Sequence, residues 1–101
     1  MKPAKPKQEL VREKRGEDMY EYFPLGKYIV AAPKVCRGRP TFKYTRIQVA
    51  FVLDLLAEGW TVDRVTREYK ASNITAPAVR EAINLAKKAF VQASPVLQPA
   101  A

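Results

Sequence analysis

The sequence predicts a mainly α-helical domain: a three-helix helix-turn-helix of the homeodomain or winged-helix kind, preceded by a short N-terminal β-hairpin. Two observations carry this prediction. A Gly-Arg-Pro turn signal at residues 38–40 lies between two short apolar runs, and three helical patterns over residues 47–93 are separated by short polar breaks. The chain is expected to divide into a basic flexible arm (1–18), an aromatic segment with the hairpin (19–46), the three-helix core (47–93) and a C-terminal tail (94–101).

The N-terminal part of the chain shows few signals of regular structure. Residues 1–7 combine prolines and lysines with too little apolar surface to order themselves, which predicts a flexible arm. Residues 8–15 are long enough for about two helical turns before Gly16. Residues 28–32 and 41–45 are expected to form the two strands of the hairpin. The tyrosines beside these strands either cover the core or stack on nucleic-acid bases.

The first core helix is expected over residues 47–58, with Gly59 as its left-handed cap. This segment is apolar on nearly every side, so it must be buried on nearly every side. Two further helices and a hairpin cover only part of it, which predicts a homodimer whose interface includes Phe51, Val52 and Leu55. The alternative is that the tyrosine-rich segment of the same chain wraps over the remaining surface.

The next two helices form the expected helix-turn-helix. Thr61 is placed to cap a helix over residues 61–69, and Thr75 is placed to cap a helix over residues 76–92. The inward stripe of this last helix is expected to be apolar: Val79, Ile83, Ala86 and Phe90. Its outward stripe is predicted to enter the major groove of double-stranded DNA: Arg80, Asn84, Lys87 and Lys88. Such side chains are also typical of a helix that simply faces solvent.

The charge of the chain favours a polyanionic partner. Its 18 Lys and Arg residues against 10 Asp and Glu residues give a net charge of +8 and a pI near 9.8. Residues 27–47 contain basic residues and no acidic one, and two of them, Arg39 and Lys43, are predicted to contact DNA phosphates. A solvated basic face is the alternative for this stretch.

Several residue types that other functions need are missing from the sequence. Cys36 is the only cysteine, so no intrachain disulfide forms, and a reducing, cytoplasmic location is expected. No apolar run approaches the ~18 residues of a membrane span. The chain has no histidine, which excludes Ser-His and Cys-His catalysis and imidazole-based metal sites. We therefore expect no enzyme, no cofactor, no metal site and no membrane partner.

One long run of residues resembles a known family. The run is Gly38-Arg39-Pro40-Thr41-Phe42-Lys43-Tyr44-Thr45-Arg46-Ile47-Gln48-Val49, followed by Leu53, Leu55, Leu56, Gly59-Trp60, Val65, Tyr69, Val79, Ala82 and Ile83. It is similar to the pattern of domain of unknown function 433. The resemblance implies a helix-turn-helix that dimerises, as in bacterial antitoxins, and a nuclease-like toxin as a second partner. Tyr44 stands where the family pattern has glycine, and Gln48 where it has proline.

These observations together predict a DNA-binding transcriptional regulator of antitoxin type that acts as a homodimer. The alternative is a protein-interaction module that masks a nuclease-like toxin without contacting DNA. Arg46, at the start of the first core helix, is expected to hydrogen-bond to backbone carbonyls or to an acidic side chain and not to DNA. The reason is that a charged residue beside a buried helix needs a partner.

Overall fold

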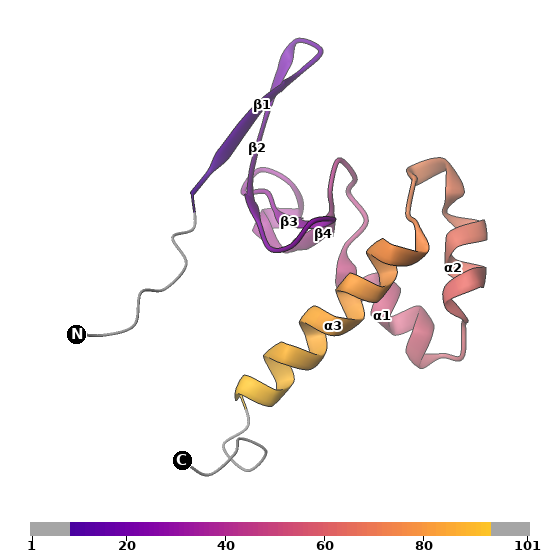
Figure 1. The fold of residues 1–101 in the computed structure, drawn as a ribbon. Helices are drawn as coiled ribbons and strands as arrows, with labels where there is room; N and C mark the ends of the chain where they lie inside the picture. The colour runs from indigo at the N-terminus through magenta and orange to yellow at the C-terminus, as the bar shows by residue number, and fades with distance from the viewer. Residues whose placement is uncertain (1–8, 94–101) are drawn as a thin grey trace. The chain divides into compact units, whose positions relative to one another are not determined.

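The computed structural model describes residues 9–93 of the chain. The chain divides into two compact units, one ending at Val49 and the other beginning at Ala50. The N-terminal unit carries an antiparallel sheet and the C-terminal unit carries the helices (Figure 1). The expected C-terminal tail, residues 94–101, and the first residues of the expected arm lie outside the described residues.

Strands β1 (Val11–Arg15) and β2 (Asp18–Pro24) form a hairpin at the start of the described chain (Figure 1). Arg15 pairs with Asp18, so the turn between the strands consists of Gly16 and Glu17. Gly16 has a φ of 64°, and a two-residue hairpin turn commonly places glycine at its first central position for this reason.

Two shorter strands complete the sheet. β3 (Ile29–Ala31) pairs antiparallel with the end of β2 on one side and with β4 (Pro40–Phe42) on the other. The sheet is four-stranded, in the order β1-β2-β3-β4. The connection from β3 to β4 contains a short 3-10 turn, η1 (Cys36–Gly38).

The prediction of a mainly α-helical domain with a short hairpin is wrong. Four antiparallel strands and three helices make this an α+β fold. The expected hairpin of residues 28–32 and 41–45 corresponds to β3 and β4, but residues 11–15, within the expected arm and placed as a helix over 8–15, form β1. The charged sequence of β1 gives almost no strand signal, because pairing with β2 and not local propensity makes it a strand.

The core of the N-terminal unit lies on the sheet. Tyr22, Val30 and Ala32 form a buried cluster, and the half-buried Val11, Tyr20 and Val35 pack against it. Tyr20 and Tyr22 thus belong to the core of the unit, as one of the two readings of the tyrosines predicts. Their rings lie 5.1 Å apart in a tilted arrangement.

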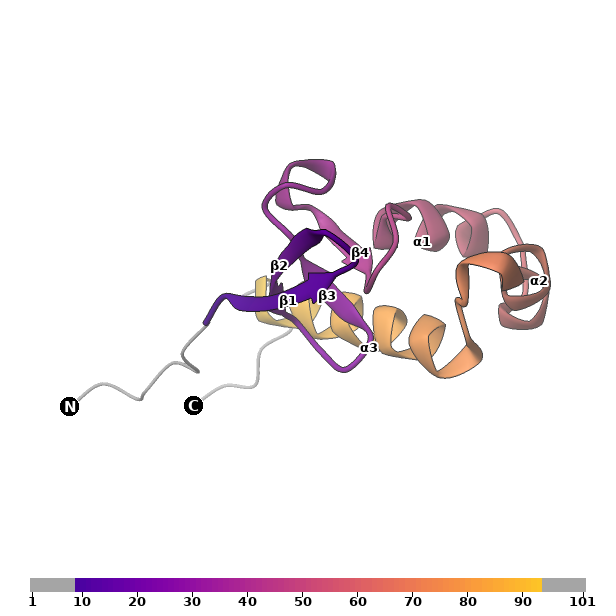
Figure 2. The same cartoon turned by 90° about the horizontal axis from the view of Figure 1, so that it is seen from above.

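The C-terminal unit contains three helices, α1 (Val49–Ala57), α2 (Val62–Glu68) and α3 (Ala76–Ala93), which Figure 2 shows from above. All three lie where the sequence predicts them, within about two residues. Gly59 follows the end of α1, and its φ of 105° and the hydrogen bond from its amide to the Leu56 carbonyl (3.0 Å) confirm the glycine cap.

Each of the three helices contributes a fully buried valine to the core: Val52, Val65 and Val79. Ile74 in the segment before α3 and Ala78 and Ala82 on α3 are also buried. α2 and α3 contact each other within this unit. The buried side of α3 therefore lies along its first half, which leaves the opposite side of that helix to solvent.

Candidate functional site

The basic side chains predicted on α3 all lie at the surface. Arg80, Asn84, Lys87 and Lys88 are exposed. Successive residues of an α-helix are about 100° apart, so these four positions fall within one arc of roughly 100°. None of the four forms a salt bridge within residues 9–93. The structure thus presents one unpaired polar stripe along the longest helix of the described chain.

The N-terminus of α3 is held by its expected cap. The Thr75 hydroxyl accepts a hydrogen bond from the Ala78 amide at 3.4 Å, and Ala78, Val79 and Ala82 are buried. Two residues of the predicted inward stripe are exposed instead, Ile83 by 37% and Phe90 by 65%. The apolar stripe is therefore buried only near the N-terminal end of α3.

Helix α2 and a polar connection precede α3 in the chain. Thr61 caps α2 by accepting from the Arg64 amide at 3.0 Å, and Asp63 pairs with Arg67 at 3.3 Å. The connection contains the 3-10 turn η2 (Lys70–Ser72) and Asn73, whose φ is 60°. It spans residues 69–75 and is longer than the turn of roughly three or four residues that joins the helices of a standard helix-turn-helix.

Of the three residues predicted at a dimer interface, one is exposed on the single chain. Phe51 is 44% exposed and packs edge-to-face on Tyr69, with ring centroids 5.9 Å apart. Val52 and Leu55 are buried. The dimer itself stays a prediction, and Phe51 is the residue of the three that offers free apolar area to a partner.

The two residues of the N-terminal unit predicted to contact phosphates differ in their surroundings. Arg39 is exposed directly after η1. Lys43 is half-buried, with its Nζ 3.8 Å from a Glu13 carboxylate oxygen, 4.9 Å from the centre of the Tyr22 ring and 5.0 Å from the Tyr44 ring. Lys43 therefore has partners in its own unit, whereas Arg39 forms no salt bridge within residues 9–93.

Glu13 lies at the centre of a hydrogen-bonded cluster that sequence reasoning did not find. The hydroxyls of Tyr22 and Tyr44 donate to its two carboxylate oxygens at 2.6 and 2.7 Å. These bonds, with the charge of Lys43 beside them, lower the pKa of Glu13 below 4.5. The same carboxylate raises the pKa of Tyr22, and the Tyr22 hydroxyl raises the pKa of Lys43.

Tyr44 connects the β1–β2 hairpin to the turn after β4. Its φ of 68° is left-handed, a conformation that costs a non-glycine residue about 1–2 kcal/mol. Its amide donates to the Tyr20 hydroxyl at 3.0 Å, and the guanidinium of Arg15 lies 3.9 Å from its ring centre. The resemblance described from the sequence has glycine at this position, and glycine adopts such a φ without strain.

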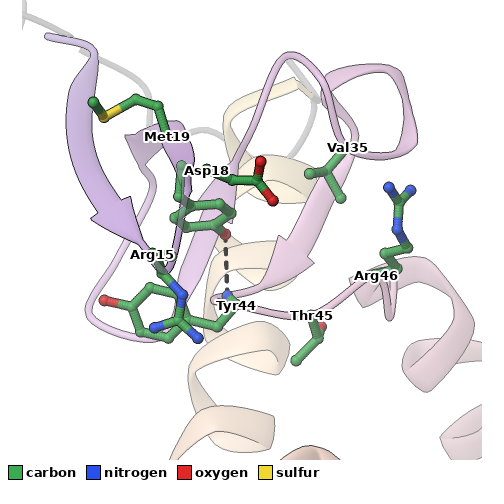
Figure 3. Close-up of a pocket in the computed structure, with 8 residues that line it drawn as sticks. Arg15, Asp18, Met19, Val35, Tyr44, Thr45 and Arg46 are labelled. Atoms are coloured by element: carbon green, nitrogen blue, oxygen red, sulfur yellow. Dashed lines mark hydrogen bonds between the residues drawn. The ribbon is translucent and has the colours of Figure 1, made fainter.

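A pocket of about 270 Å³ lies where the hairpin meets the rest of the N-terminal unit (Figure 3). The hairpin contributes Arg15, Asp18, Met19 and Tyr20 to its lining. The other wall consists of Val35, Tyr44, Thr45 and Arg46. Figure 3 shows the Arg15 guanidinium across the ring of Tyr44 and Arg46 on the opposite side, beside Val35.

Arg46 does not play the structural role expected of it. Its side chain is exposed and forms no salt bridge in the described part of the chain, while its backbone carbonyl accepts from the Cys36 thiol at 3.4 Å. Thr45 has the role of turn former instead, since its hydroxyl donates to the Phe42 carbonyl at 2.8 Å and accepts from the Ile47 amide at 3.0 Å.

The described residues contain neither a metal-binding cluster nor a helix suited to a membrane. Between residues 9 and 93, no cluster of three or more Cys, Asp or Glu side chains is arranged to hold a metal ion. Over the same range, none of the helices is both long and apolar enough to cross a membrane.

Comparison with known proteins places the chain in a family. No curated protein and no solved structure matches it. The family model described as "Protein of unknown function (DUF433)" matches residues 29–86, which run from β3 into α3 and exclude the β1–β2 hairpin. Because this match covers more than half of the 101 residues, the chain belongs to the DUF433 family.

Proposed function

We propose that this protein is a homodimeric, DNA-binding transcriptional regulator of antitoxin type. The observation that supports it best is the stripe of Arg80, Asn84, Lys87 and Lys88, exposed along α3 and free of salt bridges within residues 9–93. Arg and Asn side chains read guanine and adenine edges in the major groove, and Lys side chains neutralise phosphates.

The order of elements also supports this proposal. A capped short helix and a polar connection precede a longer helix, α3, which is buried on one side near its N-terminus and presents its basic side outward. Arg39 and the net charge of +8 supply further attraction to phosphates. Lys43 contributes less than the sequence predicts, because Glu13 and two tyrosines engage it.

The antitoxin role and the toxin partner rest on the family resemblance and on nothing in the geometry. A cytoplasmic location fits a chain with one cysteine. A dimer would set two α3 helices against half-sites about 34 Å apart, one turn of duplex. Phe51, exposed on α1, is the candidate contact between the two copies.

The test measures duplex DNA binding by the full chain against salt concentration, with its own upstream region and a random duplex as ligands. Arg80→Ala is expected to cost about 1–3 kcal/mol on the specific duplex and to relax base preference. Lys87→Ala is expected to weaken both duplexes alike and to reduce the slope of log K against log salt by about 0.9. Lys14→Ala on β1, in the N-terminal unit, removes one positive charge that does not belong to α3 and serves as the control.

Two results would contradict the proposal. If the folded chain binds neither duplex at low salt, the DNA-binding function is wrong and the toxin-masking module takes its place. If Lys14→Ala and Arg80→Ala weaken the specific duplex equally, the binding is a general attraction of charge and α3 is not the reading element.

A further inference from the structure

The pocket between the β1–β2 hairpin and the turn after β4 is independent of the α3 stripe. All of its lining residues belong to the N-terminal unit. Half of its wall comes from residues 15–20, which the family match does not include, and the other half from residues 35–46, which it does. The pocket therefore depends on a hairpin that lies outside the residues matched by the family model.

The hairpin is fastened at this place by specific contacts. Tyr44 occupies a left-handed conformation that glycine would adopt without strain. Three contacts offset this strain. The Tyr44 hydroxyl donates a hydrogen bond to Glu13 on β1, the Arg15 guanidinium stacks on the Tyr44 ring, and the Tyr44 amide donates to the Tyr20 hydroxyl on β2. Strained residues that the surrounding structure holds in place occur preferentially at binding sites.

The lining of the pocket offers hydrogen-bond donors that have no acceptor. The Arg15 guanidinium stacks on the Tyr44 ring at 3.9 Å, which leaves its N–H groups free, and Arg46 forms no salt bridge within residues 9–93. The Tyr20 hydroxyl accepts from Tyr44, and its own proton has no acceptor among the same residues. Two guanidinium groups and a single carboxylate, that of Asp18, line the pocket, so the lining has a net positive charge.

The remaining surface of the pocket suits a planar ring. Tyr20, Met19 and Val35 provide apolar and aromatic lining, and a guanidinium stacked on a tyrosine offers a flat outer face on which a base can stack. Asp18 can accept a hydrogen bond from the exocyclic amino group of a base. A volume of about 270 Å³ leaves room for more than an inorganic anion.

We propose that this pocket binds a nucleoside monophosphate unit, with the base stacked on the outer face of the Arg15 guanidinium, near Asp18, and the phosphate on the Arg46 guanidinium at the opposite wall. Forked guanidinium donors fit phosphate oxygens in pairs, and the stack on Tyr44 holds Arg15 in position before the ligand arrives. The unit is either a free nucleotide or the 5′-terminal nucleotide of a single strand, since both carry the same groups.

The experiment follows the amide signals of the ¹⁵N-labelled full chain while ligand is added. Adenosine 5′-monophosphate is expected to shift the amides of Arg15, Tyr20, Tyr44 and Arg46 saturably. Inorganic phosphate and unphosphorylated adenosine are each expected to bind about tenfold more weakly, a difference of about 1.4 kcal/mol. A 5′-phosphorylated single strand identifies the source: tighter binding than the mononucleotide indicates a strand end, and weaker binding indicates a free nucleotide.

Matched variants distinguish nucleotide binding in the pocket from a general attraction between charges. Arg46→Ala is expected to weaken the mononucleotide about tenfold, and Arg46→Lys, which keeps the charge and loses the fork, about threefold. Lys34→Ala removes an exposed charge outside the lining and is expected to change the affinity by less than about twofold. The amide spectrum of each variant shows directly whether it is folded.

Three results would overturn the proposal. The first is the absence of saturable shifts at millimolar mononucleotide in the folded chain. The second is a set of shifts confined to α3, which would assign nucleotide binding to the proposed DNA-binding surface instead. The third is equal binding of phosphate and mononucleotide, which would show that the site holds an anion without its base. Duplex binding through Arg80 is measured separately and is expected to survive Arg46→Ala, so the two proposals fail independently.

Discussion

Replacing Tyr44 by glycine and by alanine isolates the backbone strain at this residue. Both replacements remove the same contacts: the hydrogen bond to Glu13, the stack with Arg15 and the ring contact with Tyr20. They differ in how they tolerate a φ of 68°. Alanine keeps the left-handed cost of about 1–2 kcal/mol, and glycine removes it.

Glycine also has a disadvantage in the unfolded chain, where its greater freedom costs about 0.4–1 kcal/mol relative to alanine. The two effects oppose each other, and the strain is the larger. Tyr44→Gly is therefore expected to be more stable than Tyr44→Ala by about 1 kcal/mol, the reverse of the usual order. Both variants are expected to be less stable than the parent chain, because each loses the three contacts that hold the hairpin.

The assay is urea unfolding followed by circular dichroism, with the free energy extrapolated to water at constant slope. The control pair is Lys34→Gly and Lys34→Ala, at an exposed position outside the left-handed region, where alanine is expected to be the more stable by about 0.4–1 kcal/mol. If alanine is also the more stable residue at position 44, Tyr44 is not strained and the reasoning is refuted.

Three further predictions follow from the contacts of both units. The pKa of Glu13 is lowered in the folded chain, so its contribution to stability is present above the ordinary value of 4.5 and is lost as the pH falls through the lower folded value. Glu13→Gln is expected to flatten the pH dependence of the unfolding midpoint between about pH 5 and pH 3, and an unchanged dependence would contradict this assignment. Thr61→Ala is expected to lower the free energy of unfolding by about 1 kcal/mol and Thr61→Ser to leave it nearly unchanged, because the hydroxyl caps α2; equal losses in a urea titration would exclude the cap as the cause. Sedimentation at micromolar concentration is expected to show a dimer. Phe51→Lys is expected to dissociate it, and Ala71→Lys, at an exposed control position, is expected to leave it intact. If the parent chain is a monomer, the predicted dimer interface is wrong.

The sequence by itself determined the elements whose signals are local. The three helices, the glycine cap at Gly59 and the threonine caps at Thr61 and Thr75 were predictable, because periodicity and capping act within one or two turns. β3 was also predictable, since Ile29–Ala31 is an apolar run between turn residues. The exposure of the α3 stripe follows from the same periodicity.

Only the tertiary structure decided the rest of the sheet and the pocket. The charged β1 becomes a strand because it pairs with β2, and its own residues show no strand pattern. The hairpin signals lie outside β1: Gly16 in the turn, and the alternation of Tyr20, Glu21 and Tyr22 in β2. The role of Lys43 was likewise decided by residues distant in sequence, since Glu13 contacts it from another strand. Tyr44 could not be assigned from sequence either, because both its strain and its compensation come from how the hairpin folds onto it. Interactions between residues far apart in sequence depend on chain closure, which a local pattern does not encode.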